Sequence, residues 1–358
     1  MSDQERTGKG PSMAEVAAHA GVSAQTVSRT LRGHPYVTAE KRARVLASAE
    51  QLGYRMNSAA KALSSGRTRI VGVVMMATDG YAGAATHALA EQAARTRGYG
   101  VAVTQTPSLA LADVLAAVRR LEENGAEALV LALPLRRSSP QLEAVAARIP
   151  TATIGGSPVL AARRFDVDQR SVARLVTEHL LTLGHCTVHH VAGPEDWIDA
   201  VQRESGWRDA LSGHGIEPPP VRRGDWSAAS GHRIGLEMFE DRTVSAVLAA
   251  NDETAVGLVR ALHDLGRHVP GDVSVAGVDD IPLAAYTTPR LTTVRQPFQA
   301  LTSIAVSTVI ALLEGEAVPT LDADLRPELV VRESTAPPGS TVGRASLPPQ
   351  ESSHDPAR

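Results

Sequence analysis

The spacing of hydrophobic residues changes near residue 69. Before that point, apolar residues recur at helical spacing in short segments that Gly and Pro interrupt, which predicts short helices. After it, short apolar runs alternate with amphipathic stretches of helical length, which predicts strands that alternate with helices. The chain is therefore expected to carry a small all-α unit followed by a larger α/β unit.

Three short helices are predicted within residues 12–56. Each has a candidate N-cap and a glycine where it ends: Ser12 and Gly21, Ser23 and Gly33, Thr38 and Gly53. Because a tight Gly-Val-Ser turn lets the second helix cross the first, this pattern is typical of a helix-turn-helix. Residues 1–11 are predicted to be a disordered polar arm.

Residues 69–335 show the alternation of strands and helices. The candidate strands are 70–76, 101–105, 128–133, 151–155, 188–193, 244–250 and 273–278. The candidate helices lie near 84–97, 109–124, 168–183, 200–213, 228–240 and 252–265. This order indicates βαβ units, with more strands than one small sheet needs. We therefore expect two doubly wound parallel-sheet lobes, with a ligand in the cleft between them at the carboxyl ends of the strands.

Two segments have too little apolar surface to fold alone. Residues 57–68 contain Leu63 as their one large apolar side chain, so we interpret them as a hinge that becomes helical when it packs against a partner. Residues 336–358 are rich in Pro, Ser and Gly and carry no heptad pattern. They predict a disordered tail that does not oligomerise.

The charge of the chain is unevenly distributed. Residues 1–69 carry eleven Lys and Arg against five Asp and Glu, a net charge of +6. Because the whole chain has a net charge of −3, the other 289 residues carry −9. A basic head on an acidic body is expected of a protein that binds a phosphate backbone with one end. A short basic segment is often only a solvated surface, so charge alone does not decide the function.

Cysteine count and hydropathy bear on the compartment. Cys186 is the only cysteine, so no disulfide can form within the chain. The first residues are polar, and no run of 18 apolar residues occurs. We expect a cytoplasmic protein with no membrane partner.

Longer motifs point to a family. The segment EVAAHAGVSAQTVSRTL at 15–31, followed by a third helix and a Gly-Tyr pair, resembles the headpiece of the lactose-repressor/galactose-repressor family of bacterial transcription regulators. The body is similar to that family's sensor domain at LGH (183–185), VAGP (191–194), RESGW (203–207), GDWSAASG (224–231), AANDETAVG (249–257), DVSVAGVDD (272–280) and LTTVRQPF (291–298). The resemblance spans roughly residues 12–333.

The resemblance implies a complete mode of action. The chain would be a repressor of sugar-utilisation genes that binds double-stranded operator DNA as a homodimer. Residues 69–335 would form a periplasmic-binding-protein-like domain that dimerises and binds a sugar or glycoside effector. Sugar-induced release from the operator is favoured over sugar-enhanced binding.

The second helix of the headpiece carries the candidate base-reading residues. A recognition helix reads base edges with its first exposed side chains, which here are Ala24, Gln25 and Arg29. The Gln amide suits adenine, the Arg guanidinium suits guanine, and the Ala methyl suits the thymine methyl. Hydroxyls suited to phosphate contacts are those of Ser12, Ser23, Thr26 and Ser28. A lone Gln and Arg would be interpreted as a solvated helix face, but inside this motif base reading is favoured.

The resemblance adds two further expectations about DNA. The hinge would enter the minor groove, where Leu63 wedges a base step open and Asn57 adds a polar contact. Packing of Leu63 on the sensor is the alternative. The family's usual Pro-Asn before the hinge is Met56-Asn57 here, so the start of the hinge helix is less sharply set. The family's namesake has a larger side chain at the position of Ala24, so the operator should differ from its operator.

The body contains the residue types of a sugar site. Such sites combine aromatic platforms with groups that pair every hydroxyl, because an unpaired buried hydroxyl is costly. The candidate effector-binding residues are Trp197, Arg203, Trp226, Asn251, Asp279, Gln296 and Phe298. Core packing is the alternative for either tryptophan alone. By resemblance, Trp226 stacks on the sugar, Asn251 and Asp279 bind hydroxyls, and Arg203 is a ligand-binding arginine. Asp280 is expected to cap or brace the loop.

Three positions depart from the namesake's pattern. Gly155, Val201 and Met76 stand where it has a ligand-facing Asp, a ligand-facing Arg and a Ser, respectively. The effector is therefore expected to be a related sugar or glycoside and need not be a galactoside.

Other function classes are disfavoured. The chain lacks a Rossmann G-x-G-x-x-G after a strand, a Walker motif, H-E-x-x-H and G-x-S-x-G, so no catalytic residues and no cofactor are expected. An exported sugar-binding protein would need a signal peptide and no headpiece. The cluster of His179, His185, Cys186, His189 and His190 matches no zinc pattern, so no metal is expected. His185 is instead predicted to close a helix, where a cation suits the dipole.

Overall fold

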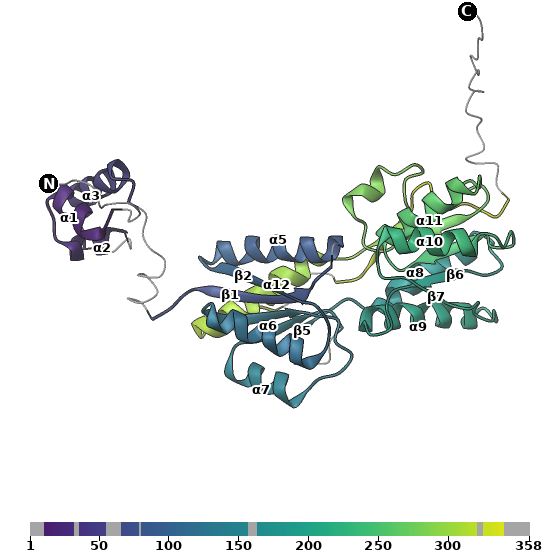
Figure 1. Cartoon of the computed structure of the whole chain (residues 1–358), viewed down its shortest axis with the longest axis horizontal. Helices are drawn as coiled ribbons and strands as arrows, with labels where there is room; N and C mark the ends of the chain where they lie inside the picture. Colours follow the sequence, from purple (N-terminus) through teal and green to yellow (C-terminus); the bar gives the residue numbers. More distant parts are fainter. Residues whose placement is uncertain are drawn as a thin grey trace, which may run out of the picture. The chain divides into compact units, whose positions relative to one another are not determined.

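The computed structural model describes residues 11–31, 36–54, 66–78, 80–156, 163–320 and 325–339. The chain divides into two compact units, Met1–Arg69 and Ile70–Arg358 (Figure 1). Asn57 and Leu63, which the sequence assigns to the DNA contact, lie outside the described residues. Within the described ranges, no helix has the length and apolar character needed to cross a membrane.

The described residues of the first unit form three short helices, as predicted. They are α1 (Met13–Ala20), α2 (Ala24–Leu31) and α3 (Ala39–Gln51). A capping box starts α1: the Glu15 amide donates to Ser12 Oγ at 3.3 Å, and the Ser12 amide donates to Glu15 Oε2 at 2.6 Å. Each helix contributes one fully buried valine to a common core: Val16, Val27 and Val45. A small all-α headpiece is therefore confirmed.

The second unit begins with a five-stranded parallel sheet in the order β2-β1-β3-β4-β5. Its strands are β1 (Ile70–Met76), β2 (Gly100–Thr106), β3 (Ala126–Ala132), β4 (Thr151–Ile154) and β5 (Arg164–Phe165). The intervening helices are α5 (Tyr81–Thr96), α6 (Leu111–Glu123) and α7 (Pro140–Arg148). Separate apolar clusters pack α5 against one face of the sheet and α6 and α7 against the other (Figure 1). This is a doubly wound lobe.

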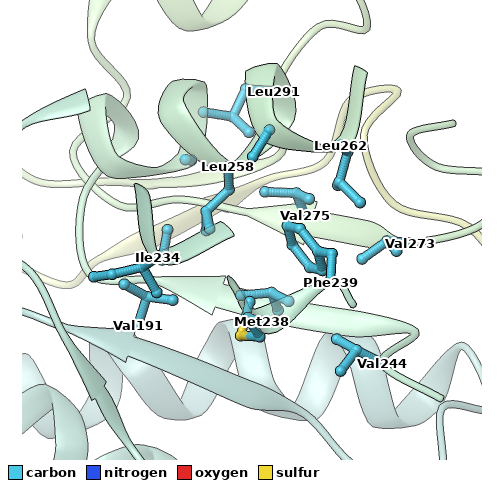
Figure 2. Packing of buried hydrophobic residues seen from close by; sticks show 14 of the residues in the cluster. Val191, Ile234, Met238, Phe239, Val244, Leu258, Leu262, Val273, Val275 and Leu291 are labelled. Atoms are coloured by element: carbon cyan, nitrogen blue, oxygen red, sulfur yellow. The ribbon is translucent and has the colours of Figure 1, made fainter. Parts of the chain in front are cut away.

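A second lobe follows, with a four-stranded parallel sheet in the order β7-β6-β8-β9. Its strands are β6 (His189–Ala192), β7 (Arg222–Arg223), β8 (Ala246–Ala249) and β9 (Ser274–Ala276). Its helices are α8 (Gln169–Thr182), α9 (Ile198–Gly213), α10 (Ala228–Met238) and α11 (Asp252–Asp264). Figure 2 shows how Ile234 and Met238 of α10 and Leu258 of α11 meet Val191 and Val275 of the sheet. The two parallel-sheet lobes predicted from the sequence are confirmed.

One long helix was not predicted. α12 (Phe298–Glu314) brings the chain back to the first lobe and packs beside α5 (Figure 1). Its residues are apolar or small around most of its circumference, so it lacks the polar stripe by which a surface helix is recognised. A short antiparallel pair, β10 (Thr293–Arg295) and β11 (Glu328–Val330), was also missed.

His185 closes α8 as predicted, through its amide, which donates to the Leu180 carbonyl at 3.4 Å, but the prediction that its side chain does so as a cation is wrong. The side chain is buried: Nδ1 lies 3.0 Å from Ser245 Oγ, and Nε2 lies 3.1 Å from Ser274 Oγ and 3.0 Å from the Ala336 carbonyl. Burial lowers the pKa of His185, which favours the neutral ring. Ala336, where the disordered tail was predicted to begin, is itself buried, and its amide donates to Ser274 Oγ at 3.0 Å.

Two glycines of α9 provide a test of how closely α8 and α9 approach. A Cβ on Gly206 would lie 2.1 Å from the Arg170 carbonyl oxygen of α8, whereas a Cβ on Gly213 would meet nothing within 4 Å. Gly206→Ala should lower the free energy of unfolding by about 1–3 kcal/mol, because backbone must move to admit the methyl group. Gly213→Ala should be neutral or raise it by up to about 1 kcal/mol. Urea titrations measure both free energies of unfolding. Equal values for the two variants would show that the helices are not in backbone contact at Gly206.

Candidate functional site

A pocket opens at the carboxyl ends of the parallel strands of both lobes. Met75, Met76 and Ile154 reach it from strands of the first sheet, and Asn251 and Asp279 lie in the loops that follow β8 and β9 of the second. All seven predicted effector-binding residues line it: Trp197, Arg203, Trp226, Asn251, Asp279, Gln296 and Phe298. Its volume of about 170 Å³ is comparable to that of a cavity that admits one six-membered ring. The structure thus has a pocket where the sequence analysis expects the ligand cleft.

Aromatic rings form two walls of the pocket. Trp197 and Trp226 lie with ring centroids 5.3 Å apart at an angle of 55°. Tyr81 and Phe298 meet edge to face at 6.3 Å. Trp226 has a φ of 74°, and a Cβ on Gly193 would lie 2.4 Å from its ring. Glycine at 193 is therefore what allows the indole to lie against the end of β6.

A buried polar chain connects three of the predicted residues. Arg203 Nε donates to Gln169 Oε1 at 2.8 Å, Gln169 Nε2 donates to Gln296 Oε1 at 2.8 Å, and Gln296 Nε2 donates to Asp279 Oδ1 at 2.5 Å. The Arg203 guanidinium lies 3.7 Å from Asp279 Oδ1 and 5.6 Å from the centre of the Trp226 ring, and it also donates to the Ala250 carbonyl. Gln169 was missed by the sequence analysis, because nothing local distinguishes it from any polar residue at the start of a helix.

Burial gives Asp279 an unusual protonation equilibrium. Desolvation raises the pKa of the Asp279 carboxyl to about 7, and the nearby carboxylates of Glu253 and Asp199 act in the same direction. The positive charge of Arg203 and the hydrogen bond from Gln296 oppose this rise without cancelling it. The carboxyl can therefore donate or accept a hydrogen bond near neutral pH.

Asn251 organises the pocket through the backbone. Its Oδ1 accepts the Thr254 amide at 3.0 Å and so caps α11, while its Nδ2 donates to the Trp226 carbonyl at 3.0 Å and to Glu253 Oε2 at 2.8 Å. Glu253 Oε1 in turn accepts the Tyr81 amide at 2.8 Å, at the first residue of α5 in the other lobe. A hydrogen-bonded relay thus joins the Trp226 loop to the first lobe. Glu253 was not predicted, since its contact lies 172 residues away in sequence.

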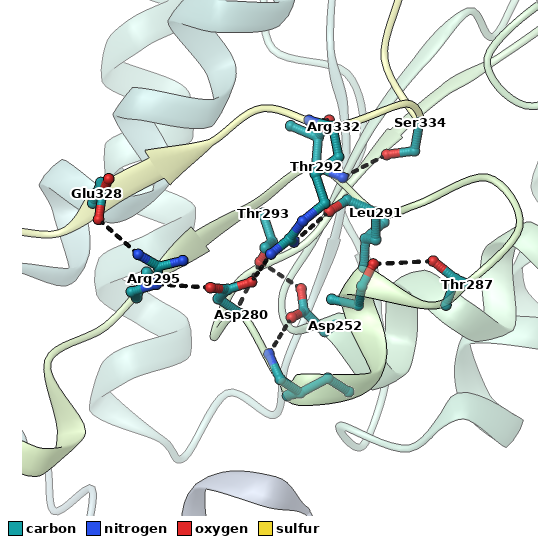
Figure 3. A network of polar contacts seen from close by, with 12 residues as sticks. Asp252, Asp280, Thr287, Leu291, Thr292, Thr293, Arg295, Glu328, Arg332 and Ser334 are labelled. Atoms are coloured by element: carbon teal, nitrogen blue, oxygen red, sulfur yellow. Dashed lines mark hydrogen bonds and ion pairs between the residues drawn. The ribbon is translucent and has the colours of Figure 1, made fainter.

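The loop that presents Asp279 is held in a strained conformation. Asp279 and Asp280 have φ values of 112° and 53°, which are unfavourable for residues other than glycine. Figure 3 shows the contacts that hold this loop. Asp280 accepts Arg295 Nε at 2.8 Å and Arg332 at 2.5 Å, which confirms that it braces the loop.

Asp252 supports the same loop from beneath. Its Oδ1 accepts the Thr293 hydroxyl at 2.6 Å, and its Oδ2 accepts the Ile281 amide at 2.9 Å (Figure 3). A Cβ on Gly277 would lie 2.1 Å from Asp252 Oδ1, so the strand passes directly over the carboxyl group. Burial and the charge of Asp279 raise the pKa of Asp252.

The helices of the headpiece separate buried from exposed residues. Val27 and Thr30 are buried on α2, whereas Ala24, Gln25 and Arg29 are exposed. Two of the predicted phosphate contacts, Ser12 and Ser23, also act as caps, because their hydroxyls accept the amides of Glu15 and Thr26. Thr26 and Ser28 are partly buried.

The structure also shows where the three positions that depart from the namesake's pattern lie, and how the histidines of the His and Cys cluster are placed. Met76 and Gly155 line the pocket, and the partly buried Val201 lies one turn into α9. Over the described part of the chain, no group of three or more His, Cys, Asp or Glu is arranged to hold a metal ion. His190 is buried and its Nδ1 lies 2.9 Å from the Leu248 carbonyl, as expected of a core histidine.

Comparisons with known proteins agree with the two units. Residues 12–57 match the family described as bacterial regulatory proteins, lacI family, and residues 177–335 match the periplasmic binding protein-like domain. The chain is 31% identical to the lactose operon repressor of Escherichia coli (strain K12) over 328 residues, covering 91% of each chain. It superposes on the lac repressor dimer bound to operator and the anti-inducer ONPF with a TM-score of 0.82 and 30% identity, over 92% of this chain and 100% of that one. For the regulator CelR in complex with cellobiose, the TM-score is 0.66 and the identity 28%, over 90% and 99%.

The raised pKa of Asp279 predicts a specific dependence of stability on pH. Between the ordinary value of 3.8 and about 7, the folded chain retains a proton that the unfolded chain has released, so stability falls as pH rises through this window. From pH 5 to pH 8, the free energy of unfolding of the wild-type chain should fall by about 2–3 kcal/mol more than that of Asp279→Asn. Urea titrations at both pH values measure the difference. Asp209→Asn, which removes an exposed carboxylate, should behave as the wild type; equal pH dependence in all three proteins would contradict the prediction.

Proposed function

Because the chain is a member of the lacI family of bacterial regulatory proteins, we propose that it represses sugar-utilisation genes and leaves its operator when a sugar or glycoside fills the pocket. It acts by binding in the cytoplasm, where its DNA is, and it catalyses no reaction. The observation that carries the proposal is the pocket itself, with aromatic walls and a buried network of an arginine, two amides and a carboxyl group.

The chemistry of the pocket suits a sugar ring. The apolar face of a sugar can lie against Trp226 or Trp197, and hydroxyls at its rim can pair with Asp279, Gln296 and Arg203. Phe298 closes the apolar side beside Tyr81. The donor groups of Asn251 are already used within the protein, so we assign it mainly to positioning Trp226 and Glu253. Solved relatives that bind cellobiose and ONPG support this class of effector.

The exposed face of α2 supports the proposed contact with DNA. Gln25 and Arg29 lie one turn apart on the face of α2 opposite Val27, and Ala24 is exposed at the first position of the helix. These side chains can therefore enter the major groove while the helix remains packed on the headpiece. Phosphate contacts from Ser12, Ser23, Thr26 and Ser28 would fix its position. One short helix reads few base pairs, so we propose a homodimer on a near-palindromic operator, as in the lac repressor dimer bound to operator.

The relay through Glu253 offers a physical route from sugar to DNA. An effector acts only through its different affinity for two arrangements of the protein, and coupling free energies of about 1–3 kcal/mol are typical. A ligand against Trp226 would press on the loop whose carbonyl is bound by Asn251, and Asn251 also holds the Glu253 carboxylate that receives the Tyr81 amide. Movement of that loop would therefore be transmitted to α5 in the other lobe.

The base-reading role of Arg29 can be tested with an operator selected from random DNA duplexes. Arg29→Ala should weaken operator binding by about 1–3 kcal/mol and relax the preference at one guanine. Arg44→Ala removes the same charge from an exposed position of α3. It should weaken operator and random DNA to a similar extent. Titrations of both variants on both DNAs measure this; if Arg29→Ala loses as much affinity for random DNA as for operator, Arg29 is not a base reader.

The role of Trp226 can be tested through release of the same operator. Trp226→Ala should bind operator with an affinity within about twofold of the wild type and should no longer be released by sugar, because the stacking platform is gone. Trp226→Phe retains a ring and should restore part of the response. Fluorescence anisotropy of labelled operator, with glucose, galactose, lactose, cellobiose and maltose added in turn, reads out both properties. If Trp226→Ala instead loses its affinity for operator and keeps its affinity for sugar, the assignment of Trp226 to sugar binding is wrong.

A further inference from the structure

Asp199 is a pocket residue that no motif had singled out. It lies in the first turn of α9, two residues after Trp197, and is one of the residues that line the pocket. Its Oδ1 is buried and has no hydrogen-bond partner among the described residues. Its other oxygen lies 3.9 Å from the point where a Cβ on Gly155 would stand. A carboxylate oxygen without a donor inside a ligand pocket requires an explanation.

We propose that Asp199 is an effector-binding residue that selects an uncharged ligand with a hydroxyl group at the edge of the pocket next to β4. This inference rests on the sugar-binding function proposed above and narrows it. Residue 155 is a glycine, so it places no side chain at this edge, and Asp199 of α9 brings a carboxylate to the same space. The acidic group that the sequence analysis found absent at Gly155 is thus supplied by a different element of the fold.

The energetics favour a ligand role over a purely structural one. An acidic residue in the first turn of a helix gains only a modest stabilisation from the helix dipole. Burying a carboxylate oxygen without a donor costs more than this. Burial raises the pKa of Asp199, and the charge of Arg203 and the Gly156 amide only partly offset this. A hydroxyl donated by a ligand would satisfy the orphaned oxygen, and an analogue that lacks the hydroxyl would leave it unsatisfied.

The charges around the pocket restrict the class of effector. Its described lining holds three carboxyl groups, those of Asp199, Glu253 and Asp279, and one guanidinium, that of Arg203. The guanidinium is already bonded to Gln169 and the Ala250 carbonyl and lies near Asp279. An incoming phosphate or carboxylate would meet three acidic groups without an uncommitted cation to receive it. The structure therefore favours neutral sugars and glycosides over sugar phosphates and uronic acids.

The test compares sugar binding by the full-length protein and its variants. Glucose, galactose, lactose, cellobiose, maltose and glucose 6-phosphate are first titrated by calorimetry, and the tightest binder is then compared with its monodeoxy analogues. For the wild type, one deoxy analogue should bind about 10- to 100-fold more weakly than the parent sugar. In Asp199→Ala, the parent sugar should lose a similar factor, and that one analogue should now bind as well as the parent.

Controls keep the two levels of the proposal distinct. Asp199→Ser provides a second variant with a small polar side chain and should show the same loss of discrimination. Asp209→Asn removes an exposed carboxylate from the same helix, where it pairs with Arg170, and should leave sugar binding within about twofold. Unchanged affinity and unchanged discrimination in both Asp199 variants would overturn the role of Asp199. If the wild type binds glucose 6-phosphate more tightly than the neutral sugars, the proposed selection for uncharged ligands is wrong. The proposed function as a sugar-responsive regulator would still stand. A wild-type protein that binds none of the six sugars would overturn the proposed function as well.

Discussion

The geometry of the pocket depends on the hydrogen bonds of one buried carboxyl group, that of Asp252. Its two oxygens accept the Thr293 hydroxyl of β10 and the amide of Ile281, which follows a loop in which Asp279 and Asp280 adopt positive φ angles. Such a loop is unfavourable in isolation and persists only where its surroundings determine it. Asp280 completes the brace through Arg295 and Arg332. With the loop held, Asp279 is placed where Gln296 and Arg203 can reach it.

A second constraint is the way the chain passes between the lobes. The five-stranded sheet is completed on one face by α12, which follows β10 of the second lobe, so the first lobe is assembled from segments far apart in sequence. Contacts such as that of Glu253 with the Tyr81 amide join the lobes near the pocket. A ligand held between groups of both lobes can therefore bias their arrangement, which is the physical requirement for control of the DNA-binding unit.

The two units use different chemistry for their proposed partners. The headpiece offers a few exposed polar side chains on one short helix, and its small core serves mainly to hold that helix. The pocket instead buries its polar groups and pairs them with one another, so that a ligand must match both their positions and their charges. Binding of DNA is thus dominated by exposed charge, and binding of the effector by desolvated hydrogen bonds.

Patterns and motifs in the sequence determined the three headpiece helices, the central strands of both sheets and the seven predicted effector-binding residues, all of which line the pocket. They succeed because helix caps, apolar runs and loop motifs act over a few neighbouring residues. Long-range packing decided the remainder. α12 was missed because it is apolar around most of its surface, and His185 was misassigned because its partners Ser245, Ser274 and Ala336 are distant in sequence. Gln169, Asp199 and Glu253 carry no local signal, since only the meeting of helix ends from separate βαβ units gives them partners. Whether a polar residue forms part of a site depends on what is buried beside it, and only the tertiary structure decides that.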